Sequence, residues 1–175
     1  MRLFTIKNTA NFMTGLLSDK EVIFDQFLLS DAIIVTGNTF TIDGHINKAF
    51  YSENELLILK QKAEDSGRIF SEEMVRWESV KSYCFSCIKG KNTPLSLKIS
   101  FSLAPENVIK FLKNIDTPLS ANDINSLNLN IKYDGSKVTL TTAVSLKIFT
   151  MNKTIEHSWD DMVAKFLVSN NFETE

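Results

Sequence analysis

The chain has 175 residues, of which 43% are hydrophobic and 23% are charged, close to the average of soluble globular domains. Nineteen basic and 21 acidic residues give a formal net charge of −2, so the basic excess typical of non-specific nucleic-acid or membrane binding is missing. Two cysteines are too few for a disulfide framework. We therefore expect a single cytoplasmic domain over residues 1–175 with no membrane-spanning segment, and 13 phenylalanines predict an aromatic-rich core.

The first 43 residues predict four strands and one helix. Residues 2–6 are β-prone, and residues 8–17 suggest a short helix. Further strands are predicted over residues 23–29, 32–36 and 39–43, with a Gly37-Asn38 turn before the last of them.

A second helix is predicted to begin after Ser52. Ser52 is suited to the N-cap, and Glu55 stands three residues on as its capping-box partner. Gly67 can end this helix. Its apolar stripe consists of Leu56, Leu59 and Ala63.

Residues 68–94 fit two patterns. The spacing of the apolar residues favours a helix up to about Lys81. After it, Tyr83, Phe85 and Cys87 alternate as in a strand. A turn over residues 90–94 would then lead into the next strand.

The second half is more regular. Residues 95–103 alternate strictly and predict a half-buried strand, and Pro105 opens a helix whose apolar stripe includes Phe111. Residues 127–133 and 138–141 flank Asp134-Gly135, which predicts a hairpin. A third strand is expected over residues 145–150, followed by a helix whose stripe runs from Ile155 to Leu167.

Both halves, residues 1–66 and 95–169, thus show the order strand, helix, three strands, helix. The fold class is α+β, with antiparallel β-rich sheets and an internal duplication of a β-α-β-β-β unit as our expectation. This order resembles the plan of the DNA sliding-clamp domain, in which helices line the inner face. A clamp-like, nucleic-acid-associated protein is therefore one alternative, and it requires a set of lysines to converge on one helical face: Lys7, Lys60, Lys62, Lys110, Lys113 and Lys165.

Cys84-Phe-Ser-Cys87 is the only C-x-x-C motif. Two thiolates at this spacing can share a metal or close a redox disulfide. Zinc needs four ligands, and His45 and His157 are the only histidines. On a regular strand the two side chains would point to opposite faces, so we expect ordinary core cysteines, with a small metal or redox protein as a second alternative.

Three further groups are candidate ligand-binding residues. Asp43 and His45 offer a carboxylate and an imidazole around Gly44, although Asp-Gly is primarily a turn signal. Arg76 and Trp77 could stack on a ligand, although a Trp in a helical stripe is usually core. Lys89 and Lys91 belong to the densest basic group in the chain, in a segment that lacks the spacing of a phosphate-binding loop.

The sequence also resembles a set of short uncharacterised proteins from clostridial-type anaerobic bacteria. The resemblance lies in Thr39-Phe-Thr-Ile-Asp-Gly-x-Ile46 with Phe50, in Arg76-Trp77, in Ile88-Lys-Gly-Lys-x-Thr-Pro94, in Leu129-Asn-Ile-x-Tyr133 and in Trp159. It implies a bacterial origin and no activity. With no enzyme signature such as G-x-S-x-G or H-E-x-x-H, we predict a non-enzymatic binding or scaffold module of unknown ligand and partner, without a cofactor and with self-association as one option.

Overall fold

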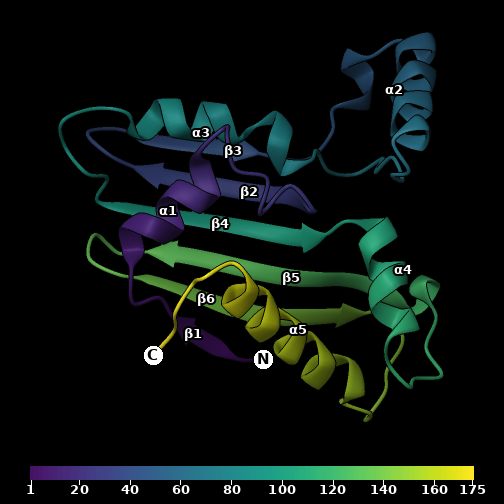
Figure 1. The fold of residues 1–175 in the computed structure, drawn as a ribbon. Helices are drawn as coiled ribbons and strands as arrows, with labels where there is room; N and C mark the ends of the chain where they lie inside the picture. The colour runs from purple at the N-terminus through teal and green to yellow at the C-terminus, as the bar shows by residue number, and fades with distance from the viewer.

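The computed structural model describes residues 1–175 and contains one six-stranded antiparallel sheet in the order β1-β6-β5-β4-β2-β3 (Figure 1). The α+β class is therefore confirmed. The strands are β1 Leu3–Thr5, β2 Phe27–Val35, β3 Thr39–Asp43, β4 Ser96–Leu103, β5 Ile124–Tyr133 and β6 Val138–Leu146. The helices are α1 Thr9–Leu17, α2 Glu53–Asp65, α3 Lys81–Ile88, α4 Pro105–Lys113 and α5 Thr154–Ser169. None of these helices is both long and apolar enough to cross a bilayer.

One face of the sheet is covered by α1, α3 and α5, which lie in front of it in Figure 1. Alternate residues of the strands point toward these helices, as the period of two requires. Leu97, Ile99 and Phe101 of β4 are fully buried there, as the strict alternation predicted. The helices supply their own apolar stripes, and Trp159 of α5 is completely buried.

Phenylalanine rings form the centre of this core, which confirms the aromatic-rich interior. Phe24 contacts the rings of Phe12, Phe27, Phe101 and Phe172 at centroid distances of 5.5 to 6.2 Å. The Phe12 ring meets Phe24 edge-on, the Phe27 ring is tilted, and the rings of Phe101 and Phe172 are stacked on it. The cluster joins α1, β2, β4 and the segment after α5, so it fastens both ends of the chain to the middle of the sheet.

The opposite face of the sheet has no helix on it (Figure 1). An antiparallel sheet can leave one face to solvent when that face is polar. Lys98 and Lys132 are exposed and lie opposite each other on β4 and β5, and the neighbouring positions on this face are half-buried serines, threonines and asparagines. No aromatic residue of β4, β5 or β6 points outward there, so the face lacks the stacking platforms of single-strand nucleic-acid binders.

Two predicted strand boundaries are wrong. The predicted strands at residues 23–29 and 32–36 are one strand, β2, which continues through a bulge between Leu29 and Asp31. The predicted strand at residues 145–150 does not form, because β6 ends at Leu146 opposite Ile124, the first residue of β5. Beyond that pair, residues 147–150 have no neighbouring strand with which to pair.

The strand predicted after Lys81 is also wrong. Residues 81–88 form α3, preceded by a 3-10 turn at Trp77–Ser79. Cys84 and Lys81 lie three residues apart on the buried side of this helix, while Tyr83 and Phe85 are exposed. The alternation of aromatic residues that suggested a strand therefore reflects exposed positions of a short helix.

The predicted duplication is not confirmed. The halves share the order strand, helix, two strands, helix, but β1 lies at the sheet edge beside β6, whereas β4 lies inside the sheet between β5 and β2. The final helices differ as well, because α5 packs on the sheet and α2 has no buried residue.

We call residues 45–72, which carry α2, the arm; it projects from the sheet beyond β3 (Figure 1). The predicted capping box between Ser52 and Glu55 is present. Glu72, at the end of the arm, accepts hydrogen bonds from Lys60 in the middle of α2 at 2.6 Å and from Lys48 near the start of the arm at 2.9 Å. Hydrogen bonds from Lys60 and then from Lys48 lower the pKa of Glu72 to about 2.

Candidate functional site

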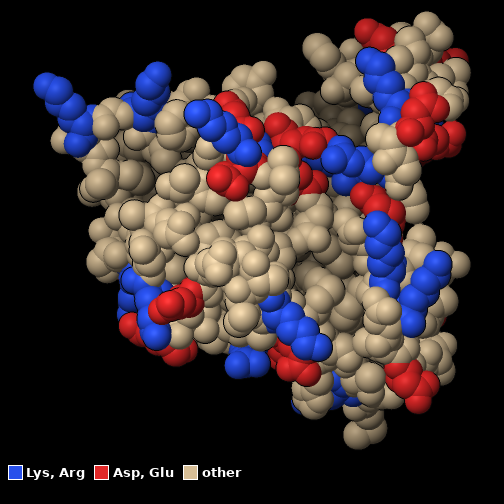
Figure 2. All heavy atoms as spheres, viewed as in Figure 1, with Lys and Arg blue, Asp and Glu red and all other residues tan.

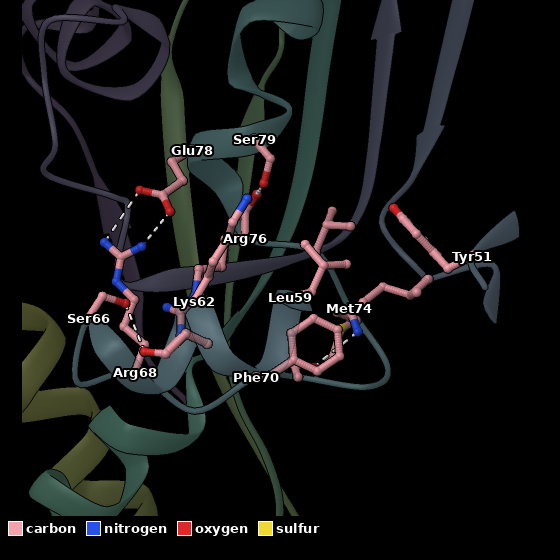
Figure 3. Close-up of a pocket in the computed structure, with 14 residues that line it drawn as sticks. Tyr51, Leu59, Lys62, Ser66, Arg68, Phe70, Met74, Arg76, Glu78 and Ser79 are labelled. Atoms are coloured by element: carbon pink, nitrogen blue, oxygen red, sulfur yellow. Dashed lines mark hydrogen bonds and ion pairs between the residues drawn. The ribbon is translucent and has the colours of Figure 1, made fainter. Parts of the chain in front are cut away.

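A cleft with a volume of about 370 Å³ lies between α2 and the following segment, residues 68–79 (Figure 3). Figure 3 shows Lys62, Arg68 and Arg76 toward one end of the cleft, and Leu59, Phe70 and Met74 toward the other. The cleft is therefore divided into a basic half and an apolar half.

Backbone hydrogen bonds fix the floor of the cleft against the sheet. Val75 donates its N–H to the carbonyl of Gly44 at 2.8 Å and accepts from the N–H of Leu29 at 2.9 Å. Gly44 lies so close to β2 that a Cβ atom there would stand 2.0 Å from the carbonyl oxygen of Leu29. The glycine is thus required by this close approach, and its interpretation as a turn signal is wrong.

Of the candidate ligand-binding residues predicted from the sequence, only Arg76 lines the cleft. Its guanidinium donates to Glu106 at 2.8 Å and to the carbonyl of Ile69 at 3.2 Å. Both charged side chains of the pair are largely buried, with 15% and 11% exposure. Arg76 is therefore mainly a structural link between the cleft and α4.

Arg68 and Lys62 have more capacity to bind a ligand. Arg68 pairs with Glu78 through one short and one long contact, the second at 3.4 Å, and this pairing raises the pKa of the guanidinium. A guanidinium has five N–H donors, so several remain unused. Lys62 is exposed and has no acidic partner, so its ammonium is available at the rim.

The Asp43–His45 pair lies at the end of β3, outside the cleft. The His45 ring nitrogen Nδ1 is 2.6 Å from the Asp43 carboxylate, whose pKa is lowered by hydrogen bonds from the His45 backbone and ring. Both side chains are mostly exposed, His45 to 60% and Asp43 to 73%. No further His, Cys, Asp or Glu joins this pair in an arrangement that could hold a metal ion.

The other candidates lie elsewhere. Trp77 is fully buried and donates its ring N–H to the carbonyl of Leu16 at 2.9 Å, so it belongs to the core. Lys89 and Lys91 are exposed in the loop between α3 and β4, at the opposite end of β3 from the cleft.

Cys84 and Cys87 are free thiols one turn apart on α3. Burial, followed by the nearby Cys87, raises the pKa of the Cys84 thiol to about 12, so it remains protonated at neutral pH. No histidine accompanies them, and the structure contains no group of three or more residues arranged to hold a metal.

The lysines of the clamp alternative are spread over four segments of the chain. They lie on α2, α4, α5 and in the loop after β1. On the face that the helices cover, Figure 2 shows a broad uncharged area with basic and acidic side chains interspersed around its margin. This view gives no support to a basic, helix-lined channel.

The sequence analysis placed Lys62 only among the lysines of the clamp alternative, and it did not propose Arg68, Phe70 or Met74 as site residues. The stripe of α2 was correctly predicted to face the protein, and Leu59 and Ala63 do line the cleft. The only sequence signal for Arg68, Phe70 and Met74 is their position just after α2, because the weak apolar stripe of that helix needs adjacent chain to pack against.

Comparison with curated proteins and with solved structures finds no match. A protein-family profile, described as a family of unknown function (DUF5721), matches residues 16–175, which is nearly the whole chain. That match does not test the clostridial origin or the clamp-like plan, which stay predictions. The chain belongs to this family of unknown function, DUF5721.

Proposed function

We propose that the chain is a non-enzymatic cytoplasmic binding module whose cleft accepts a small amphipathic anion. The observation that carries this proposal is the division of one cleft into an apolar half and a basic half. Ligand sites typically combine an apolar lining with a few placed polar groups, and a volume of about 370 Å³ lies within their usual range.

The apolar half suits a flat or branched hydrocarbon body. Leu59 from α2 faces Phe70 and Met74 from the segment after it, so a ligand would bridge the arm and its base. Methionine adapts its shape to irregular ligands and makes favourable contacts with aromatic rings. Binding there would bury side chains that α2 leaves half-exposed in the free protein.

The basic half selects an acid group. Glu78 pairs with Arg68 and Glu106 pairs with Arg76, so the cleft has an excess of one positive charge, that of Lys62. Arg76 is committed to Glu106, which leaves Lys62 and the unused donors of Arg68 for a carboxylate, sulfonate or phosphate oxygen.

The test uses two fluorescent probes of the same shape. 8-Anilinonaphthalene-1-sulfonate carries an apolar body and an anionic group, whereas N-phenyl-1-naphthylamine lacks the sulfonate. We expect saturable one-to-one binding of the sulfonate and about tenfold weaker binding to Lys62→Glu, a loss of roughly 1.4 kcal/mol. The neutral probe should bind both proteins alike.

Two controls accompany this titration. Lys165→Glu changes an exposed lysine of α5 away from the cleft and should leave both affinities unchanged. Ala63→Phe fills the cleft and should weaken both probes. Non-saturable binding, or an equal response of the two probes to Lys62→Glu, would refute the proposal.

A further inference from the structure

The free edge of β3 is a second feature that the cleft does not use. β3 is the last strand of the sheet, and only β2 pairs with it. The hydrogen bonds from Thr36 to Asn38 and from Gly44 to Ser30 fix the alternation of the ladder. The backbone N–H and C=O groups of Thr39, Thr41 and Asp43 therefore point away from β2, without a partner strand.

This edge lacks the usual protection. Native proteins keep edge strands short or place lysine, proline or a bulge on them, because an unpaired edge is a template for another strand. β1, the other edge, is three residues long, whereas β3 has five residues in regular register and neither lysine nor proline. Thr, Phe and Ile at its centre favour extended structure.

We propose that β3 pairs antiparallel with β3 of a second copy of this chain, which joins the two sheets into one. The edge can pair with a copy of itself, because the residues whose backbone groups point away from β2, Thr39, Thr41 and Asp43, are arranged symmetrically about Thr41. A two-fold axis there places Thr39 opposite Asp43 of the partner and Phe40 opposite Ile42 of the partner. No like charges face each other, and the Thr39 hydroxyl can donate to the Asp43 carboxylate across the pair.

The arm and the basic loop supply a second, independent argument. The arm leaves the C-terminal end of β3 and extends beyond the sheet edge (Figure 1). The loop at residues 89–94 lies at the opposite end, because Leu95 hydrogen-bonds Val35 beside the β2–β3 turn. The same two-fold axis therefore brings each arm to the partner's loop.

These two elements have opposite charge. α2 contains four acidic and two basic side chains, so its net charge is −2, whereas the loop contains Lys89 and Lys91 and no acidic residue. Figure 2 shows basic side chains projecting at the end where this loop lies, and acidic together with basic side chains on the arm. The outer side of α2 also exposes Leu57 and Ile58, at 63% and 46%, which the partner would cover.

The arm contact is necessary for a stable pair. A single five-residue strand pairing buries far less than the roughly 1,200 Å² of a standard specific interface. Without the arm, association through β3 alone would be transient. The proposal therefore requires both the strand edge and the charged arm contact.

Sedimentation velocity of the full chain, at concentrations up to on the order of 100 μM, tests the proposal. We expect a dimer, at least tenfold weaker dimerisation in Thr41→Lys, and unchanged dimerisation in Thr5→Lys, the same substitution on the other edge strand. The double variant Lys89→Glu, Lys91→Glu should also weaken the dimer, and raised salt should weaken the parent dimer but not this variant. Lys110→Glu with Lys113→Glu on α4 is the matched charge control.

Oxidative crosslinking identifies the register directly. Thr41→Cys places two sulfurs at the two-fold axis, where facing Cα atoms of a hydrogen-bonded antiparallel pair are about 5.5 Å apart, within disulfide range. We expect a reducible dimer from Thr41→Cys and none from Thr5→Cys. A monomer at all concentrations, or a dimer that Thr41→Lys leaves intact, overturns the proposal, and neither outcome depends on probe binding in the cleft.

Discussion

Removal of the Asp25 carboxylate would leave a buried ammonium without its acidic partner. Lys81 is the only charged residue among the fully buried ones, and its Nζ donates to Asp25 at 3.1 Å and to the carbonyl of Glu21 at 2.6 Å. The exposed fractions of the Lys81 and Asp25 side chains are 6% and 12%. Water can therefore replace the lost carboxylate only in part.

The burial of this ion pair sets the loss of unfolding free energy that we expect from Asp25→Ala. Breaking a buried ion pair by removing one partner typically costs about 3–5 kcal/mol. Because the Glu21 carbonyl stays in place, we expect Asp25→Ala to cost about 3 kcal/mol, at the lower end of that range. Lys81→Met keeps most of the buried stem and leaves an Asp25 carboxylate that reaches solvent, so it should cost about 1–2 kcal/mol.

Urea melts followed by tryptophan emission measure these losses, because Trp77 and Trp159 are both fully buried in the folded chain. The double variant Asp25→Ala, Lys81→Met should cost about 1–2 kcal/mol less than the sum of the single changes. A coupling energy below about 0.5 kcal/mol would show that the two groups act independently and would refute this reasoning.

Three other changes test the packing, the cleft floor and the arm. Phe111→Ala should cost about 3–5 kcal/mol in the same melts, and a loss under about 1 kcal/mol would mean that α4 does not face a core. Gly44→Ala should lower stability by more than about 2 kcal/mol because its Cβ would collide with the Leu29 carbonyl, while Gly37→Ala, with open space around it, should stay within about 0.5 kcal/mol. The lowered pKa of Glu72, about 2, means that its stabilisation of the arm is complete above pH about 4.5 and is lost as the pH falls toward 2. Amide exchange in α2, corrected for intrinsic rates, should therefore accelerate over that range, and Glu72→Gln should reduce the pH dependence to the part that comes from the Glu55 cap, whose pKa is lowered by hydrogen bonds from Ser52.

The helices and strands that could be predicted are those whose own residues show the hydrophobic periodicity or the start signal of the element. β3 and the start of α4 at Pro105 lie where the sequence placed them. Strand ends could not be predicted in the same way, because a strand continues only while a neighbour pairs with it. Residues 147–150 are as β-prone as the preceding ones, yet β5 begins at Ile124 and offers them no partner.

Long-range contacts explain the error at α3. A buried lysine is foreign to any apolar stripe, and Lys81 is buried only because Asp25 and the Glu21 carbonyl, 56 and 60 residues away, receive its ammonium. A periodicity analysis that places every lysine on the exposed side therefore assigns the wrong buried face to residues 81–88. The neighbouring aromatic residues then suggest a strand.

The candidate site was predicted only through Arg76. Its neighbours in the cleft come from residues 46–51, from α2 with Ser66, and from residues 68–79, which have no motif in common. Their proximity depends on the hydrogen bonds that hold Val75 between Gly44 and Leu29. The sequence suggests that Gly44 belongs to a turn, and it does not reveal that the Leu29 carbonyl occupies the space where a Cβ atom would lie.

The pairing of β1 with β6 has a consequence for synthesis on the ribosome. β1 can join the sheet only after residues 138–146 have left the exit tunnel, and Ile6 then bridges to Thr174 while Phe12 packs on Phe172. Translation adds roughly 5–20 residues per second, so the N-terminal strand waits many seconds as an unpaired β-prone segment. During that interval Phe4 and Phe12 lack the contacts that bury them in the folded protein, so the nascent chain exposes apolar surface.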